Sequence, residues 1–547
     1  MGFHAPPYFS GGIVVADSDS MIPEGNRKEP PYPKEKCILE MHNVWKVYPN
    51  GVIANSGIDL FIEQGKIHAL LGENGAGKST LMKILFGFER PSSGIIKFGG
   101  QEVVINSPHK AIEMGIGMVH QHFMLVPSLT VAENVVLGIE PRKGLSINMA
   151  QSKKLVEEAG VQYGLQVPVG KKVKDISVGM RQRVEIIKTL VRGANLIILD
   201  EPTAVLTPQE TVELFKALRL LVEKGKTVIF ITHKLNEVKQ IADQITVLRR
   251  GKVIGTAEVS DVTQQDMSRM MVGRDVDLTI EKDTPNPGDP ILSVDKIEFE
   301  SEDHVKTLQG VSFALHRGEI LGIAGVEGNG QTELIQIITG LGKSTEGTIR
   351  IKRKDIIKTS PGKMRKLGMS HIPADRMTKG VALDTSIEEN IVSDRFHKRP
   401  FSFKGMLFPR TIRSFASKMV KSFDIRTDSP KSQLKMLSGG NIQKVVVSRE
   451  FTADAEIIIA DQPTRGIDVG AADFIRRSLI QERDKGVAIL LISADLTELL
   501  EVSDRVLVLY HGEFVAHFPK AKGLTETTLG EYMLGIQRMT LEEMGEC

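Results

Sequence analysis

Short apolar runs alternate with longer amphipathic segments along most of this chain of 547 residues. Residues 66–71 form one such run, and the segment after it has apolar positions at the spacing of a helix that packs on a core. The run 196–199 is likewise followed by an amphipathic segment at 209–223. This alternation predicts an α/β fold with a largely parallel sheet. Residues 39–61 and 291–315 carry only the strand pattern, so we expect β-structure there.

The whole pattern occurs twice along the chain. Residues 65–79 and 318–332 share one layout and lie roughly 250 residues apart. The apolar strand that ends at Asp200 recurs as a strand that ends at Asp461, and a third block recurs at a similar distance. Similar spacing over three separated blocks indicates the duplication of a whole domain rather than a small structural repeat.

Proline and glycine mark the expected boundaries of the two copies. The stretch 283–290 contains three prolines and is too short to be a domain, so it is interpreted as part of a linker. The start of the chain is rich in glycine, proline and serine, which is typical of a disordered leader and equally compatible with translation from Met21. We therefore expect a leader at 1–37, a first domain at 38–280, a linker at 281–290, a second domain at 291–540 and a tail at 541–547.

Composition and charge narrow the possible function classes. Apolar residues make up 41% of the chain and charged residues 25%, as in soluble globular proteins. A formal net charge of +2 gives no reason to expect a nucleic-acid partner. The two cysteines, Cys37 and Cys547, form neither a disulfide framework nor a zinc pattern. No uncharged apolar run reaches the roughly 18–20 residues that span a bilayer, so we expect no transmembrane segment.

Candidate chemistry is concentrated in a glycine-rich loop between an expected strand and an expected helix. The loop fits the G-x-x-x-x-G-K-[ST] motif without a mismatch. Its glycines let backbone N–H groups approach phosphate oxygens, and the helix N-terminus adds a positive field. The lysine of this motif reaches the β- and γ-phosphates, and the next hydroxyl ligates Mg²⁺. We therefore predict a nucleoside triphosphate site at Gly72, Glu73, Asn74, Gly75, Ala76, Gly77, Lys78, Ser79 and Thr80.

A second motif indicates the class of nucleotide-binding protein. Residues 437–444 have the sequence LSGGNIQK, which resembles the LSGGQ signature of ABC-type ATPases. From Leu39 to Gln537 the motifs of that family follow in its order in both copies: aromatic loop, phosphate loop, Q-loop, signature, acidic strand end, D-loop and switch histidine. The resemblance implies two tandem P-loop ABC ATPase domains, each with a RecA-like α/β core, an antiparallel β subdomain and a helical signature subdomain.

The resemblance also implies two nucleotides, each held between the phosphate loop of one domain and the signature of the other. In the first site it implies that Glu201 polarises the attacking water and that Tyr48 stacks on adenine. The catalytic group is then expected to be Lys78, Gln121, Glu201 and His233, the metal-binding group Ser79, Gln121 and Asp200, and the cross-domain group Ser438, Gly439, Gly440 and Asp468.

The second site lacks most of this polar chemistry. Gln331 stands at the lysine position without the charge, and Gln462 stands at the position of Glu201 but cannot take a proton. The losses fall on one site although each site draws on both copies, so we expect one hydrolytic site and one regulatory or structural site. The degenerate site is expected to contain Gly325, Gly330, Gln331, Thr332, Asp461, Gln462 and Ala494, with Ser177 and Gly179 from the first copy.

Two such copies in one chain resemble the ATPase subunits of monosaccharide and nucleoside importers. The resemblance implies ATP hydrolysis with Mg²⁺ at the cytoplasmic face of the inner membrane, on two integral-membrane permease subunits served by an extracytoplasmic substrate-binding protein. Residues 177–186 and 203–210 favour the nucleoside branch, with ribose or galactose, or a vitamin such as riboflavin, as alternatives. The rival class is a soluble tandem ABC protein that acts on ribosomes. Such proteins keep both sites intact and carry a long charged helical linker.

Overall fold

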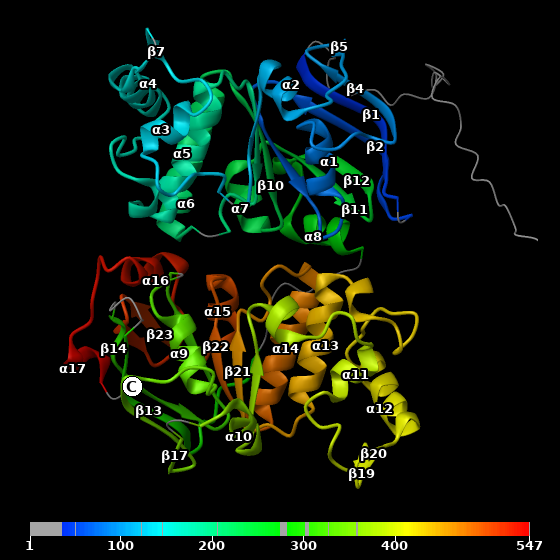
Figure 1. Cartoon of the computed structure of the whole chain (residues 1–547), viewed down its shortest axis with the longest axis vertical. Coiled ribbons are helices and arrows are strands. Elements are labelled where there is room, and N and C mark those ends of the chain that lie inside the picture. Colours follow the sequence, from blue (N-terminus) through cyan, green and yellow to red (C-terminus); the bar gives the residue numbers. More distant parts are fainter. Residues whose placement is uncertain are drawn as a thin grey trace, which may run out of the picture.

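The structure of the protein, a computed structural model, describes residues 36–49, 51–121, 123–144, 146–204, 206–273, 282–300, 306–326, 328–356 and 359–545. Residues 1–35 of the expected leader, residue 281 of the expected linker and the last two residues of the expected tail lie outside the described residues. Within the described ranges the chain forms a first half, residues 37–273, and a second half, residues 282–545, stacked one on the other (Figure 1).

The first half contains a small antiparallel sheet and a larger, mainly parallel sheet. The strands of these two sheets are β1 (Cys37–Val47), β2 (Ile53–Glu63), β3 (Ile67–Leu71), β4 (Ser93–Phe98), β5 (Gln101–Glu102), β6 (Ile116–Val119), β9 (Leu196–Asp200), β10 (Thr227–Thr232), β11 (Gln244–Arg249) and β12 (Lys252–Glu258). The short strands β7 (Arg142–Lys143) and β8 (Ser146–Ile147) pair with each other in a further small sheet. The antiparallel sheet has the order β2-β1-β4-β5, and the larger sheet has the order β12-β11-β3-β10-β9-β6. In the larger sheet β12 runs antiparallel at one edge, and the remaining strands run parallel to one another.

The second half repeats this arrangement. The strands of its two main sheets are β13 (Pro290–Glu300), β14 (Lys306–His316), β15 (Ile320–Ala324), β16 (Glu346–Ile351), β17 (Lys354–Asp355), β18 (Met369–Ile372), β21 (Ile457–Asp461), β22 (Ala488–Ile492), β23 (Arg505–Tyr510) and β24 (Glu513–Phe518). The short strands β19 (Ser402–Phe403) and β20 (Met406–Leu407) pair with each other in a further small sheet. The two sheets have the orders β14-β13-β16-β17 and β18-β21-β22-β15-β23-β24, with β24 antiparallel at the edge. Both predictions, a largely parallel sheet in each copy and β-structure at the start of each copy, are confirmed.

Helices cover the parallel sheets, and a group of them forms a separate helical part in each half (Figure 1). The first half has α1 (Lys78–Leu85), α2 (Pro108–Glu113), α3 (Val131–Val136), α4 (Met149–Gln162), α5 (Val178–Val191), α6 (Pro208–Glu223), α7 (Leu235–Ile241) and α8 (Gln264–Val272). The second half has α9 (Gln331–Ile338), α10 (Pro361–Lys366), α11 (Ile387–Val392), α12 (Pro409–Ser422), α13 (Gly439–Phe451), α14 (Val469–Asp484), α15 (Leu496–Val502), α16 (Glu526–Met533) and α17 (Leu541–Met544). The helical parts are α3, α4 and α5 in the first half and α11, α12 and α13 in the second.

Burial explains why the central strands are almost entirely apolar. Residues 196–199 of β9 and 457–460 of β21 are each at most 1% exposed. A parallel sheet covered by helices on both faces buries both sides of each strand, so an apolar run without alternation is the expected pattern. The polar side chains are left for the positions just beyond the strand ends, where the loops converge.

The two halves pack head to tail. At one end α6 lies against α16, and Gln209 Nε2 donates to the carbonyl oxygen of Thr527 at 3.1 Å. At the other end the start of α14 lies against the first half. A Cβ at Gly470 would lie 3.7 Å from Val272 Cγ1 and 3.8 Å from Glu73 Oε1. Figure 1 shows the consequence: the helical part of each half lies across from the sheets of the other.

Candidate active site

The glycine-rich loop lies between the carboxyl end of β3 and the start of α1. Gly77 has a left-handed φ of 100°, and a Cβ there would collide with the carbonyl oxygen of Ala54. A Cβ at Gly72 would likewise collide with the carbonyl oxygen of Leu248. Because neither position has room for a side chain, the loop requires glycine at both. The loop ends in a helix N-terminus, whose N–H groups favour an anion.

Lys78 is enclosed by this loop. The residue is 5% exposed, and its Nζ donates to the carbonyl oxygens of Gly72 at 2.6 Å and Glu73 at 3.1 Å. Burial lowers the pKa of Lys78, while the carboxylates of Glu201 and Asp200 act in the opposite direction. Among the described residues no carboxylate forms an ion pair with Lys78. Its charge is therefore available to a phosphate group.

The oxygen atoms next to Lys78 suit a magnesium ion. Asp200 is the last residue of β9, and the nearby hydroxyl of Ser79 acts to lower the pKa of its carboxylate. Burial raises the pKa of Asp200, and the charge of Glu201 raises it further. A cation at this point would therefore stabilise the ionised carboxylate. One carboxylate and one hydroxyl, completed by phosphate oxygens and water, are a donor set that Mg²⁺ accepts.

Glu201 is the centre of a polar group at the strand ends. Its backbone has a left-handed φ of 47°, and its N–H donates to the carbonyl oxygen of Ile231 at 3.0 Å. One carboxylate oxygen accepts from Gln121 Nε2 at 3.1 Å, and the other is bonded to His233 Nδ1 at 2.9 Å. Burial raises the pKa of Glu201, but the hydrogen bond and charge of His233, with the charge of Lys78, outweigh burial and lower it overall. The carboxylate is therefore ionised at neutral pH and oriented from two sides.

Tyr48 lies beside the end of the phosphate loop. Its hydroxyl donates to Glu89 Oε1 at 3.0 Å and is 3.5 Å from Thr80 Oγ1. Lys46 Nζ lies 5.3 Å from the centre of the Tyr48 ring, so a cation is near the ring face. The tyrosine is thus close to the loop that would hold the phosphates, and its predicted contact with adenine stays a prediction.

The cross-domain residues of the second half meet the first half near Glu73. Asp468 begins α14 by accepting from the N–H of Ala471 at 2.7 Å, and a Cβ at Gly440 would collide with its carboxylate. Burial and the charge of Asp468 raise the pKa of Glu73, while the nearby backbone N–H of Gly470 acts in the opposite direction. Ser438 and Gly439 begin α13 beside this point. Phosphate loop, D-loop and signature therefore gather at one place, from two halves of the chain.

The second half keeps the backbone of the site while its side chains differ. Gln462 has a φ of 48°, and its N–H donates to the carbonyl oxygen of Ile492 at 2.8 Å, as Glu201 does to its own neighbouring strand. Its side-chain oxygen accepts from the N–H of Ala494 at 2.9 Å, so it is occupied by a backbone group. Burial raises the pKa of Asp461 to about 6.

The remaining predicted residues of the degenerate site come from both halves of the chain. Gln331 begins α9 and is 9% exposed, and a Cβ at Gly325 would collide with its Nε2. From the first half, the Ser177 hydroxyl accepts from the N–H of Met180 at 3.3 Å, and a Cβ at Gly179 would collide with the Glu210 carboxylate. Gly330 is the left-handed residue before α9, and Thr332 is exposed.

Glu185 and Lys188 fix the segment after Gln121, and neither residue was predicted from the sequence. Glu185 is 4% exposed, and its carboxylate accepts from the N–H of Met124 at 2.5 Å, while Lys188 Nζ donates to the carbonyl oxygen of Met124 at 3.0 Å. A carboxylate at a core position of α5 is the signal that was available in the sequence. A cavity of about 140 Å³ opens here, lined by Phe86, Met118, His120, Met124, Glu185 and Lys188 among others.

Fold and site together define a P-loop ATPase with two stacked nucleotide-binding halves. Residues 56–204 and 308–465 each match the family described as ABC transporter. The chain therefore belongs to the ABC transporter family, and the resemblance inferred from its motifs is confirmed. It is an ATP-binding component of that family, whose ATPase activity is coupled to transport. In the described part of the chain, no helix combines the length and apolar character needed to cross a bilayer.

Relatives whose names state a function align with nearly the whole chain. It is 46% identical over 498 residues to the guanosine import ATP-binding protein NupO of Bacillus subtilis (strain 168), covering 91% of this chain and 97% of that protein. It is 44% identical over 500 residues to the nucleoside import ATP-binding protein NupA of Lactococcus lactis subsp. cremoris (strain MG1363), covering 91% and 98%. It is 42% identical over 507 residues to the glucose import ATP-binding protein TsgD13 of Haloferax volcanii, covering 87% and 92%.

Proposed function

We propose that this chain is the ATP-hydrolysing subunit of an importer that takes nucleosides into the cell. Only one of the two nucleotide sites of the chain hydrolyses ATP. The observation that carries the proposal is the contrast between Glu201 and Gln462. Both occupy the same left-handed turn after a buried strand, but Glu201 is an ionised carboxylate held by Gln121 and His233. Gln462 is neutral and bonded to the backbone of Ala494. The nucleoside cargo is supported by the names of the two relatives above 43% identity.

In the proposed mechanism the first half binds ATP and the second half closes over it. Lys78 and the loop N–H groups hold the β- and γ-phosphates. Glu201 accepts a proton as water attacks the γ-phosphorus, the bond from that phosphorus to the bridging oxygen breaks, and ADP leaves with the bridging oxygen. His233 contacts the γ-phosphate. Ser79, Asp200 and Gln121 would hold Mg²⁺, whose charge stabilises the developing negative charge when it is bound. Across the interface the contacts come from Ser438, Gly439, Gly440 and Asp468.

The proposed assembly contains two integral-membrane permease subunits and, outside the membrane, a substrate-binding protein that this chain does not touch. The chain would bind at the cytoplasmic face of the inner membrane and contact no nucleic acid. The cavity beside Met124 supports this arrangement, because it lies on the segment that leads directly to Gln121. A permease side chain placed there would act on the residue that orients Glu201.

We propose a domain division that follows the two halves: a leader at 1–37, a first domain at 38–280, a linker at 281–290, a second domain at 291–540 and a tail at 541–547.

Sugar or riboflavin import is the alternative within the same class, and the glucose-importer relative keeps it open. Action on ribosomes is the alternative of another class. It is disfavoured because the connection between halves is short and rich in proline and because one site has lost its carboxylate.

The proposal is tested in the transporter reconstituted with its permeases and binding protein. Glu201→Gln should lower ATP hydrolysis by roughly 10²- to 10⁴-fold with ATP binding retained, because the general base is lost and the phosphate cradle is not. Glu201→Ala should cost far more activity than Gln462→Ala, the matched control in the other site. Equal losses from the two alanine variants would contradict the one-site mechanism.

The cargo is tested separately in the same preparation. Uptake of radiolabelled guanosine, ribose, glucose and riboflavin is compared, each with its own binding protein where needed. Uptake of nucleosides, abolished by Glu201→Gln, is the expected result. Uptake of a sugar or riboflavin in place of nucleosides would overturn the cargo and leave the ATPase assignment intact.

A further inference from the structure

Arg376 occupies the segment of the second half that corresponds to the Q-loop of the first half. The loop after β6 carries Gln121 two residues beyond Val119, and the loop after β18 carries Arg376 four residues beyond Ile372. The second half has no glutamine in this segment. Instead residues 376–380 form a single π-helical turn, a feature that often marks functional sites.

The Arg376 guanidinium joins this turn to the D-loop and to the signature. Its Nη1 donates to the carbonyl oxygen of Arg465 at 2.7 Å, and its Nη2 donates to the carbonyl oxygen of Gly466 at 3.0 Å. A Cβ at Gly439 would lie 2.8 Å from the same Nη2, so the guanidinium packs directly on the first residue of α13. Arg376 is thus the side chain that lies between residues 465–466 and the start of the signature helix.

The planar guanidinium of Arg376 is suited to holding two neighbouring carbonyl groups at once. Its two carbonyl partners are adjacent in the chain and lie two to three residues before Asp468. A guanidinium presents its N–H groups in a rigid plane, so it fixes the relative direction of two hydrogen bonds more tightly than the rotating point charge of an ammonium does. The Arg376 Nε–H is buried and has no partner among the described residues. No carboxylate forms an ion pair with Arg376 in the described part of the chain.

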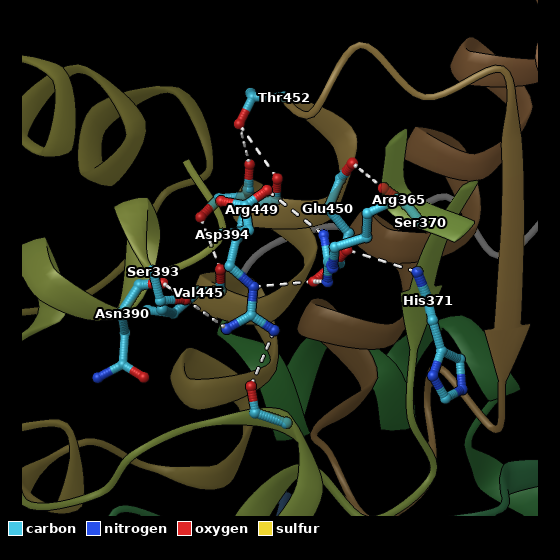
Figure 2. A network of polar contacts seen from close by, with 12 residues as sticks. Arg365, Ser370, His371, Asn390, Ser393, Asp394, Val445, Arg449, Glu450 and Thr452 are labelled. Carbon is cyan, nitrogen blue, oxygen red and sulfur yellow. Dashed lines mark hydrogen bonds and ion pairs between the residues drawn. The ribbon is translucent and has the colours of Figure 1, made fainter. Parts of the chain in front are cut away.

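The far end of the turn is fixed to the signature helix by a buried ionic network. Arg449 of α13 donates through Nη2 to the carbonyl oxygen of Gly380 at 2.8 Å and through Nε to Glu450 Oε1 at 2.8 Å. Glu450 also accepts from Arg365 Nη2 at 2.8 Å and is 0% exposed. Figure 2 shows Glu450 between Arg365 and Arg449, and Arg449 Nη1 donates to the hydroxyl oxygen of Ser393 at 3.4 Å on its other side. The turn is therefore held by α13 at Gly380 and holds the D-loop through Arg376.

We propose that Arg376 is a positioning residue of the hydrolytic site on the other half of the chain. Its fork sets the D-loop carbonyls against Gly439, so that Ser438, Gly439 and Asp468 present the correct geometry to the nucleotide bound at Lys78. The inference rests on the proposed function, because it assumes that these residues complete that site. The signature of the degenerate site comes from the first half, so the contact with Gly439 does not act on that signature.

The test compares Arg376→Ala and Arg376→Lys in the full chain assembled with its permeases. Both variants should lower kcat by about 10- to 100-fold, the cost of a small misplacement in a closed site. ATP affinity at the first-half loop should stay within about twofold, because Lys78 and its loop do not contact Arg376. Arg410→Gln, at an exposed position on α12 of the same half, is the matched control and should keep normal turnover.

A double-mutant cycle separates positioning from a merely structural role. If Arg376 acts through the D-loop, Arg376→Ala and Asp468→Ala should be non-additive, and the double variant should be no slower than the slower single variant. Full activity of Arg376→Lys, or strictly additive losses with Asp468→Ala, would overturn the inference. If thermal unfolding shows that the Arg376→Ala variant is not folded, the cycle is run with Arg376→Lys.

The same assay keeps this inference distinct from the proposed function. Glu201→Gln is measured in parallel. If Glu201→Gln hydrolyses ATP normally, the assignment of the hydrolytic site fails. If Glu201→Gln is inactive and both Arg376 variants have normal kcat, only the role of Arg376 is refuted.

Discussion

Asp461 is a buried carboxylate of the degenerate site, and burial makes its ionised form unfavourable. The intact site has a lysine that partly compensates for the same burial. Burial raises the pKa of Asp461 to about 6, and Gln331 stands where the other half has Lys78. In the intact site, the charge of Lys78 lowers the pKa of Asp200 against burial. Losing the lysine while keeping the aspartate leaves a buried carboxylate with weaker compensation.

We predict that Asp461→Asn stabilises the protein at pH 8 and has a smaller effect at pH 5. The folded-state pKa is raised above 3.8, so the stability linked to this group is present below pH 3.8 and lost as the pH rises through about 6. The neutral asparagine avoids that loss, which amounts to up to about 3 kcal/mol. The measurement is thermal unfolding of nucleotide-free, metal-free protein at both pH values. A gain of equal size at pH 5 and pH 8 would exclude the electrostatic cause.

At the scale of elements, the ionic network around Glu450 fixes α13 to β18 and to the turn that follows it. The backbone N–H of His371 in β18 lies 3.4 Å from Glu450 Oε2, and the Ser370 hydroxyl donates to the Glu450 carbonyl oxygen at 3.1 Å. Burial raises the pKa of Glu450, but the charges of Arg449 and Arg365 outweigh it, and the pKa is lowered overall. The carboxylate is therefore ionised inside the protein and fully paired.

Glu450→Gln should destabilise the second half by about 3–5 kcal/mol, because it leaves two arginines next to an uncharged, buried side chain. Asp384→Asn is the matched control, since Asp384 pairs with Lys435 at 2.9 Å but its side chain is 85% exposed, and it should change stability by less than about 1 kcal/mol. The pKa of Glu450 is depressed, so its contribution is present above pH 4.5 and is lost as the pH falls through the folded-state value. Chemical unfolding at pH 7 checks the prediction, and similar losses from the two variants would contradict it.

Elements were predictable from sequence where the signal is local. The parallel strands follow from apolar runs, and the phosphate loop follows from a motif bounded by a strand and a helix. Contacts that join distant segments were not predictable. Met124 and Glu185 are 61 residues apart, and Arg376 and Arg465 are 89 residues apart. Nothing in the spacing of these residues along the chain specifies that the fold brings them together, so the positioning residues emerged only from the packing.

At the scale of the whole molecule, the head-to-tail stacking gives the two signature serines different roles. Ser177 caps α5, because its hydroxyl accepts from the N–H of Met180 at 3.3 Å. Ser438 begins α13 without a side-chain cap, and its hydroxyl oxygen accepts from Asn441 Nδ2 at 2.8 Å. Both hydroxyls accept a bond from their own helix and keep a proton to donate, but only Ser177 caps a backbone N–H of its helix.

We therefore predict that alanine at the two positions separates stability from chemistry. Ser177→Ala should lower the stability of the first half by about 1 kcal/mol, the usual worth of an N-cap, with little change in kcat because it faces the degenerate site. Ser438→Ala should leave stability almost unchanged but slow hydrolysis by roughly 10-fold or more, because it removes a hydrogen-bond donor expected at the γ-phosphate held by Lys78. Thermal unfolding and steady-state ATPase rates of both variants, measured in the assembled transporter, provide the check. If Ser177→Ala slows hydrolysis as much as Ser438→Ala does, the hydrolytic site does not draw its signature from the second half, and the pairing of the two halves proposed above is wrong.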